Sequence, residues 1–226
     1  MYIQDVRERS QKMPNWVMNE LTCIFETSEE FQSFKNKVDE KNLYNSFFPM
    51  PEILKDTQSP SVNVDKLILE YNKQTNSTSM GLTEIVNANH PLYSEMAKQA
   101  LKNQQAFNET GYSNWYDWCY ANWGVKWDAC KLESKELSHF NTIIYSFNSP
   151  WGTPQHFVEE LSKLYPEAVF ELVAGSIEND DHYEFTCRNG ITELTRSYED
   201  FRSAVEDGKW GGWDEWAEVY EESEEV

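Results

Sequence analysis

Residues that could perform catalysis occur throughout this 226-residue chain, but their spacing matches no familiar catalytic motif. The histidines show no HExxH or HxxxH spacing, no Ser or Cys lies in a GxSxG turn, and no GxGxxG or GxxxxGK[ST] motif is present to bind phosphate. Cys119 or Cys130 could form a nucleophilic pair with His139 only if the fold happened to bring them together. The sequence therefore favours a non-enzymatic protein, and it assigns no catalytic residue, cofactor or metal site.

An aromatic segment between Asn114 and Asp128 offers a second kind of chemistry. Trp115, Trp118, Cys119 and Asn122 recur at helical spacing, and Gly124 lets the chain turn so that Trp123 and Trp127 face inward. Such a stripe is usually part of a core. The alternative is an aromatic pocket formed by Trp115, Trp118, Trp123 and Trp127, which would bind a cation or stack on an exposed base.

Charge is the strongest compositional feature. The chain has 39 Asp and Glu against 19 Lys and Arg, a net charge of -20, which excludes a nucleic-acid binder that works through a positive field. Residues 159–226 alone hold 20 acids and 5 bases, a net of -15. A block of like charge is either a solvated surface or a binding surface for a cationic partner.

The acidic end has a pattern of its own. Ser197 and Asp200 can cap one helix, and a second short helix places aromatic residues on one face and acids on the other. This segment either folds back on the sheet or docks in a groove of another protein. The residues expected to bind a partner are Trp213, Trp216, Tyr220, Glu215, Glu218, Glu221 and Glu222.

The elements that must position these groups follow from periodicity. Alternation predicts strands at 16–25, 140–147, 169–173, 182–188 and 191–195, with Asn189-Gly190 as a hairpin turn. Helices are predicted after Thr27, which forms a capping box with Glu30, and after Thr153-Pro154, with Leu164 among the inward residues. Residues 55–89 are polar and are expected to form an excursion on the surface.

The fold expected from this order is α+β. It is a ferredoxin-like (split βαβ) antiparallel sheet with two helices on one face, a long mainly helical insertion, and an acidic helical C-terminal extension. We expect one domain over residues 13–196, with the insertion at about 53–138, and the extension over 197–226.

Location is predicted from what the sequence lacks. The segment Met1 to Lys12 is charged and has no apolar run typical of a signal peptide, and nothing approaches the roughly 18 apolar residues of a membrane span. The four cysteines are scattered, which indicates free thiols. We therefore expect a cytoplasmic protein that does not contact a membrane.

Several short segments have a distinctive wording. They are Met13-Pro14-Asn15-Trp16 with Asn19 and Leu21, Phe47 to Glu52 (FFPMPE), Trp115 to Asp128 (WYDWCYANWGVKWD), Ser149 to Pro154 (SPWGTP), Tyr165-Pro166-Glu167 and Phe170-Glu171-Leu172. In these segments the chain resembles the YubB-like family of plasmid and phage proteins. The resemblance covers about Met13 to Arg188 and implies a ferredoxin-like domain carried by mobile elements. It implies no activity, and three departures stand out: twelve residues precede Met13, Val17 replaces an expected small polar residue or Cys, and the acidic end after Ser197 has no counterpart.

Two functions are compatible with these observations. The leading hypothesis is an acidic inhibitor or decoy that binds a basic surface of a host defence or nucleic-acid-handling protein, without direct contact to nucleic acid. The alternative is a small-ligand or nucleotide-binding module, or a weak hydrolase, that uses the aromatic pocket. A homodimer is left open.

Overall fold

The computed structural model describes residues 15–39, 41–77, 79–176 and 181–197. The chain forms two compact units. We name them the sheet unit, which comprises the chain up to Phe47 and from Trp123 onward, and the helical unit, residues 48–122. The acidic extension predicted over 197–226 lies outside the described residues except for Ser197.

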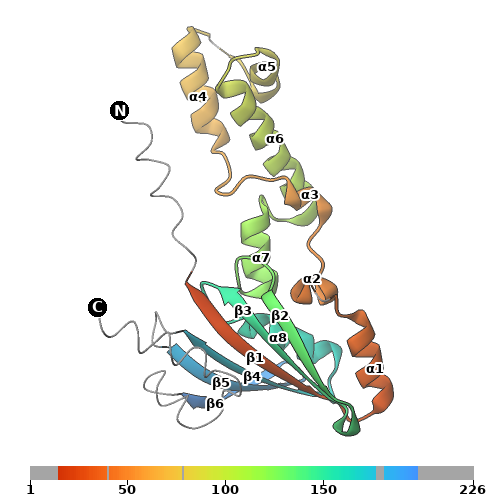
Figure 1. The fold of residues 1–226 in the computed structure, drawn as a ribbon. Coiled ribbons are helices and arrows are strands. Elements are labelled where there is room, and N and C mark those ends of the chain that lie inside the picture. The colour runs from red at the N-terminus through yellow and green to blue at the C-terminus, as the bar shows by residue number, and fades with distance from the viewer. Residues whose placement is uncertain (1–14, 40, 78, 177–180, 198–226) are drawn as a thin grey trace, which may run out of the picture. The chain divides into compact units, whose positions relative to one another are not determined.

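The sheet unit supplies all the strands named here (Figure 1). Its elements are β1 (Trp16–Ile24), α1 (Ser28–Lys37), α2 (Leu43–Phe47), β2 (Cys130–Leu137), the 3-10 turn η1 (Ser138–Phe140), β3 (Thr142–Pro150), α8 (Gln155–Leu164), β4 (Val169–Ser176), β5 (Asp181–Arg188) and β6 (Ile191–Ser197). The strands form one sheet in the order β2-β3-β1-β4-β5-β6, and every neighbouring pair is antiparallel. The predicted α+β class with an antiparallel sheet is therefore confirmed.

Strand β2 was not predicted, and its sequence explains why. It lies at an edge of the sheet and carries Lys131, Glu133, Lys135 and Glu136, so its alternation is not between apolar and polar residues. A register shift between Cys130 and Glu133 further interrupts its pairing with β3. Charged residues and bulges are common on edge strands because they discourage pairing with foreign strands.

The two faces of the sheet differ in what covers them. Helices α1, α2 and α8 bring aromatic rings onto one face. The ring centroid of Phe34 on α1 lies 6.2 Å from that of Phe170 and 6.3 Å from that of Tyr145. The rings of Tyr44 on α2 and Phe157 on α8 pack against each other, with their centroids 4.5 Å apart. Toward β6 this face is less well covered, since Phe185 is half-buried and Leu194 is 56% exposed. The other strand residues named on this face are buried, and they are Val17, Asn19, Leu21, Cys23, Ile143, Tyr145, Phe147, Ser149, Phe170, Leu172, Ala174 and Cys187. We name this side the covered face and the other the open face.

Local caps fix the helices of the covered face. The Thr27 hydroxyl accepts a hydrogen bond from the Glu30 amide at 3.2 Å, as the capping box predicts. Helix α2 is capped from far along the chain, because the Asp128 carboxylate accepts from the amides of Tyr44 at 2.8 Å and Asn45 at 3.0 Å. Burial raises the pKa of Asp128, and these amide hydrogen bonds partly oppose the shift. The prediction that Leu164 faces inward is wrong, since its side chain is 48% exposed.

The helical unit has a small core of its own. Its elements are α3 (Glu52–Lys55), α4 (Val64–Thr75), α5 (Leu82–Asn87), α6 (Tyr93–Thr110) and α7 (Trp115–Trp123), the last residue of which belongs to the sheet unit. Leu67, Tyr71, Ile85, Tyr93 and Ala97 are buried against one another. The polar stretch 55–89 therefore contributes to a packed core, because Leu67, Tyr71 and Ile85 supply its few apolar contacts.

Candidate functional site

Four glutamates form a zigzag line across the open face, one on each of four neighbouring strands: Glu20 on β1, Glu171 on β4, Glu184 on β5 and Glu193 on β6. Their spacing follows from the register of the strands. Glu20 lies opposite Val173 and Glu184 lies opposite the same residue from the other side, so that both are diagonal neighbours of Glu171. Glu193 lies opposite Thr186 and is the diagonal neighbour of Glu184. Diagonal neighbours are about 7–8 Å apart, and we name these residues the glutamate row.

Alternation within each strand places these carboxylates together. Leu21 on β1 and Leu172 on β4 are buried, so their neighbours Glu20 and Glu171 must point to the opposite side of the sheet. Glu184 lies three residues before the buried Cys187 on β5, an odd separation that places it on that opposite side too. Glu133 on β2 continues the same face, because it lies opposite Ser146, which in turn lies opposite Glu20. The open face therefore presents carboxylates across most of the width of the sheet.

The electrostatic setting of the row is not uniform. Burial raises the pKa of Glu20, and the nearby ammonium of Lys135 opposes part of that shift. Arg196 lies opposite Glu184 in the β5–β6 ladder. Glu193 is exposed at the other end of the row. Arg188, which pairs with Glu26 and Glu167, is a diagonal neighbour of both Glu171 and Glu193. Three cations beside the four carboxylates leave a strip with a small net negative charge, whose field is strongest where water is partly excluded.

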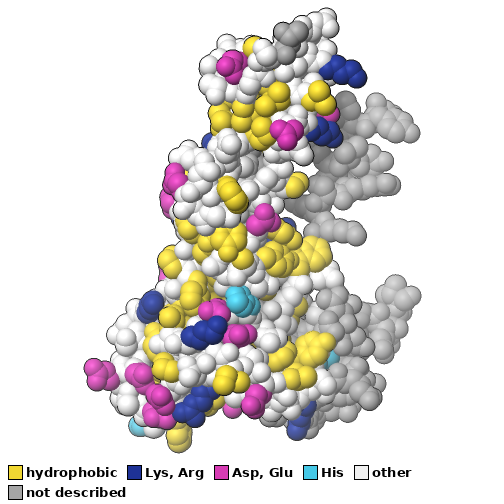
Figure 2. Space-filling view, turned by 180° about the vertical axis from the view of Figure 1, so that it is seen from behind, with side chains coloured by type: hydrophobic (Ala, Val, Ile, Leu, Met, Phe, Trp, Pro, Cys, Tyr) yellow, Lys and Arg dark blue, Asp and Glu magenta, His cyan; other side chains and the backbone are white. Residues whose placement is uncertain are grey.

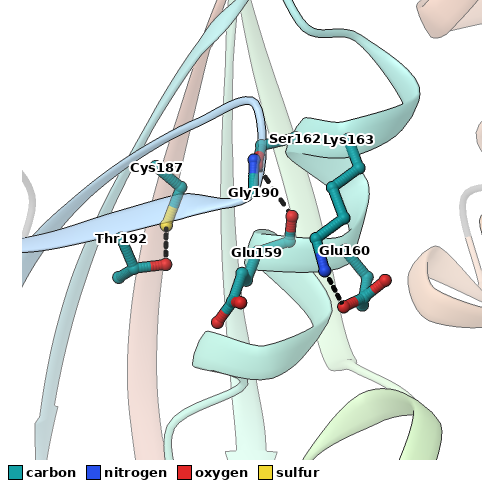
Figure 3. A network of polar contacts seen from close by, with 7 residues as sticks. All are labelled: Glu159, Glu160, Ser162, Lys163, Cys187, Gly190 and Thr192. Carbon is teal, nitrogen blue, oxygen red and sulfur yellow. Dashed lines mark hydrogen bonds and ion pairs between the residues drawn. The ribbon is translucent and has the colours of Figure 1, made fainter.

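The hairpin that carries Glu184 and Glu193 is anchored to α8. Asn189 and Gly190 have φ values of 48° and 77°, the positive values that a two-residue type I′ turn requires, and this confirms the predicted hairpin. Figure 3 shows the contact: the Gly190 amide donates to the Ser162 hydroxyl at 2.8 Å. The Ser162 hydroxyl in turn donates to the Glu159 carbonyl at 2.7 Å. Half of the glutamate row is thus held on a hairpin fixed to the covered face.

The helix side of the molecule has a different charge pattern. Figure 2 views the chain from behind, and over the sheet unit basic and acidic side chains lie among one another. Lys163 pairs with Glu160 on α8, and Lys35 on α1 pairs with Glu136 on β2. A line of like charge is therefore a property of the open face and not of the whole surface.

The four tryptophans of the predicted pocket do not share one environment. Trp118 and Trp123 are buried, at 7% and 3% exposure, whereas Trp115 and Trp127 are half-buried. Trp123 packs on Tyr44 at 5.9 Å, and Trp127 packs edge-on against Trp16 at 6.3 Å. A cation site needs exposed ring faces, so the buried pair fits the core interpretation, and the pocket stays a prediction.

The groups considered for nucleophilic chemistry do not assemble around Cys130. This residue begins β2 opposite Asn148, whereas His139 follows the other end of the strand, beyond the Leu137–Thr142 pair. Burial also raises the pKa of the Cys130 thiol, which disfavours the reactive thiolate. Within the part of the chain that the structure describes, no group of three or more His, Cys, Asp or Glu could hold a metal ion.

The seven residues predicted to bind a partner, Trp213, Trp216, Tyr220, Glu215, Glu218, Glu221 and Glu222, lie outside the described residues. The glutamate row was not predicted, although the alternation around Glu20 and Glu184 was. The alternation of each strand shows which glutamates point away from the core. Whether those glutamates are neighbours depends on the order and register of the strands, which the sequence alone does not give.

Comparison with known proteins gives little further information. No family model matches the chain, and no curated protein matches it. Among solved structures, the crystal structure of a protein api92 from Yersinia pseudotuberculosis, described as family-model DUF1281, is similar with a TM-score of 0.44 and 11% sequence identity. The match covers 82% of this chain and 98% of that one. In the described residues, no helix combines the length and apolar character needed to cross a membrane.

Proposed function

We propose that this chain is a non-enzymatic accessory protein of a phage or plasmid that acts as an acidic inhibitor or decoy. Its partner is a basic surface of a host defence protein or a nucleic-acid-handling protein in the cytoplasm. The observation that carries this proposal is the glutamate row, a regular line of carboxylates on one face of a sheet.

The physical reason is the likeness between such a line and a nucleic-acid backbone. A protein that binds nucleic acid places Lys and Arg side chains against a regular series of phosphates. Carboxylates about 7–8 Å apart on neighbouring strands offer a comparable series of anions. Because the strands are hydrogen-bonded to one another, little ordering is needed on binding, which favours affinity.

The charge of the whole chain adds to the effect of this site. A net charge of -20 attracts a cationic cleft over long distances and raises the rate of encounter. Three of the four glutamates in the row come from residues 159–226, the part with the net charge of -15. The acidic extension follows β6 directly in the sequence and adds further negative charge to the chain.

We also propose the finer description of the fold and the family resemblance that accompany this function. The order β2-β3-β1-β4, with helices α1 and α8 following β1 and β3, supports a ferredoxin-like split βαβ plan to which β5 and β6 are added. The YubB-like resemblance rests on the tryptophan segment Trp115 to Asp128 and the shorter segments listed with it.

The test is charge reversal with a matched control. One variant carries Glu171→Lys and Glu193→Lys on the open face, and the control carries Glu70→Lys and Glu109→Lys in the helical unit, which changes the net charge equally. Each immobilised protein is used to capture proteins from a bacterial lysate at low and high ionic strength, and bound proteins are then challenged with duplex DNA.

The proposal expects the wild type and the control to retain a basic protein that duplex DNA displaces, whereas the open-face variant loses it. Capture should weaken at high salt, where the Debye length falls to about 3 Å at 1 M. Equal capture by the wild type and both variants would contradict a role for the glutamate row. Replacing Glu215, Glu218, Glu221 and Glu222 with Lys tests the extension separately, since rim charges act mainly on the association rate.

A further inference from the structure

Strand β2 forms one edge of the sheet, and its outer side pairs with no other described strand (Figure 1). An edge of this kind presents backbone amides and carbonyls to which a further strand can add. Helix α1 leaves the edge accessible, because a groove of about 780 Å³ lies between Lys35 and Val38 at the end of the helix and β2. Glu133 and Ser134 are consecutive residues that point to opposite faces, and both line the groove, which therefore reaches the outer edge of the strand.

The charge of this edge differs from that of the whole chain. The chain has a net charge of -20, whereas β2 holds two Lys and two Glu and is neutral. Glu133, Ser134 and Lys135 are exposed. Neither Glu133 nor Lys135 forms an ion pair with another described residue, although the Lys135 ammonium lies near Glu20. The edge is therefore a place at which two copies of an acidic chain can approach each other.

We infer that two copies of this chain pair through β2 in antiparallel orientation, so that their sheets join into one. The two-fold axis of this dimer passes through Ser134, which lies opposite Ser134 of the second copy. Glu133 then lies opposite Lys135 of the second copy, and Lys135 lies opposite Glu133 of the second copy. Two opposite-charge pairs therefore form on one face, and cross-strand pairs of this kind stabilise a sheet.

The neighbouring registers do not offer this agreement. Directly opposite residues point to the same face, so the register changes in steps of two residues, and each step moves the axis by one residue. An axis at Glu133 places this side chain opposite its own copy, and an axis at Lys135 does the same for the lysine. Like charges directly opposite are destabilising. The axis at Ser134 avoids both contacts, and it lies within the stretch from Glu133 to Leu137 that pairs regularly with β3.

Such a dimer has its two open faces on one side of the joined sheet, because directly opposite residues point to the same face. The glutamate rows of the two copies then belong to a single wider surface. The charges on β2 that discourage pairing with foreign strands would select a second copy of the same chain. The inference is drawn from β2 alone and does not rest on the proposed function, since its tests measure association of the chain with itself.

The first test is disulfide trapping in the full chain, with Cys130→Ser to remove the one native cysteine that is not buried. Residues directly opposite in an antiparallel pair have Cα atoms about 4.5–5.5 Å apart, within the range of a disulfide. Ser134→Cys should therefore link two copies under mild oxidation. Lys98→Cys on α6 is the matched control, because this residue is also exposed, and it should remain monomeric at the same concentration.

The second test measures the dimerisation constant by analytical ultracentrifugation, at about 0.15 M salt, where a Debye length of roughly 8 Å screens the distant charges of two acidic chains. Lys135→Glu places like charges opposite each other twice and should weaken dimerisation about tenfold or more. Adding Glu133→Lys to that variant exchanges the two charges and should restore dimerisation. Lys98→Glu changes the net charge as Lys135→Glu does, away from β2, and should have little effect.

The outcomes separate the alternatives. A covalent dimer of Ser134→Cys, with association that is lost and then recovered across the charge variants, supports the inference. A wild-type chain that stays monomeric at the concentrations used for oxidation would overturn it. Dimerisation that survives in Lys135→Glu would overturn it in favour of another surface, and equal weakening by Lys98→Glu would assign the effect to net charge. If Lys135→Glu melts at a lower temperature than the wild type, Glu133→Lys alone replaces it, because it sets two lysines opposite each other twice.

Discussion

The two faces of the sheet are built from the same strands and yet follow different physical rules. On the covered face, Phe170, Leu172 and Leu21 are buried on the side where helices bring aromatic rings, and their burial contributes to stability through packing. On the open face, Glu171 and Glu20 are partly hydrated, and they contribute charge with little effect on packing. Alternation thus lets one strand serve the core and an interaction surface with consecutive residues.

The largest expected effect tests this contrast at neighbouring positions. Phe170→Ala should lower the free energy of unfolding by about 3–5 kcal/mol, because it removes a fully buried ring that contacts Phe25 and Phe34. Glu171→Ala should change it by no more than about 0.5 kcal/mol. Chemical denaturation of the two variants measures both values, and a similar loss for each would contradict the division into faces.

The second effect concerns the Asp128 carboxylate, which caps helix α2 from a distant part of the sequence. Asp128→Ala removes the acceptor for the amides of Tyr44 and Asn45 and should cost about 1–2 kcal/mol in unfolding free energy. Asp128→Asn keeps one side-chain oxygen and should cost less. If both variants are as stable as the wild type, the cap does not contribute to the stability of α2.

The third effect concerns the turn that supports the open face. Gly190→Ala should destabilise the chain by about 1 kcal/mol, because a Cβ at φ +77° is strained and would meet the Lys163 side chain. Asn189→Gly is the control, since Gly also accepts a positive φ. Hydrogen exchange should show that the loss is concentrated in β5 and β6, and uniform loss across the sheet would argue against local anchoring.

The smallest effect depends on pH. Burial raises the pKa of Glu20, so the folded state favours the protonated form of this side chain. The protein therefore loses folding stability as the pH rises through the shifted pKa and the carboxyl group ionises. Glu20→Gln should therefore raise the free energy of unfolding at about pH 7 by roughly 0.5 kcal/mol or less, because the group is partly hydrated. Near pH 3 the variant and the wild type should be equally stable. A stabilisation that persists there would point to a cause other than charge.

Much of the fold could be predicted from local sequence. Thr27 with Glu30 marked the start of α1, and Asn189-Gly190 marked the β5–β6 hairpin, because caps and two-residue turns depend on a few adjacent residues. Edge strand β2 was missed, since one hydrogen-bonding side and most of its side chains are exposed. Leu164 was misplaced because its position near the end of α8 leaves it outside the packed interface.

The candidate site shows where local reasoning ends. The sequence alone determined that the chain is strongly acidic, rich in aromatic residues, of the α+β class, and alternating around Glu20 and Glu184. The tertiary structure decided that Glu20, Glu171, Glu184 and Glu193, distant in sequence, form one line, and that Asp128 caps α2 from 83 residues beyond Asn45. The physical reason is that strand order and register arise from the packing of whole elements, and a shift of one residue would turn each glutamate toward the core.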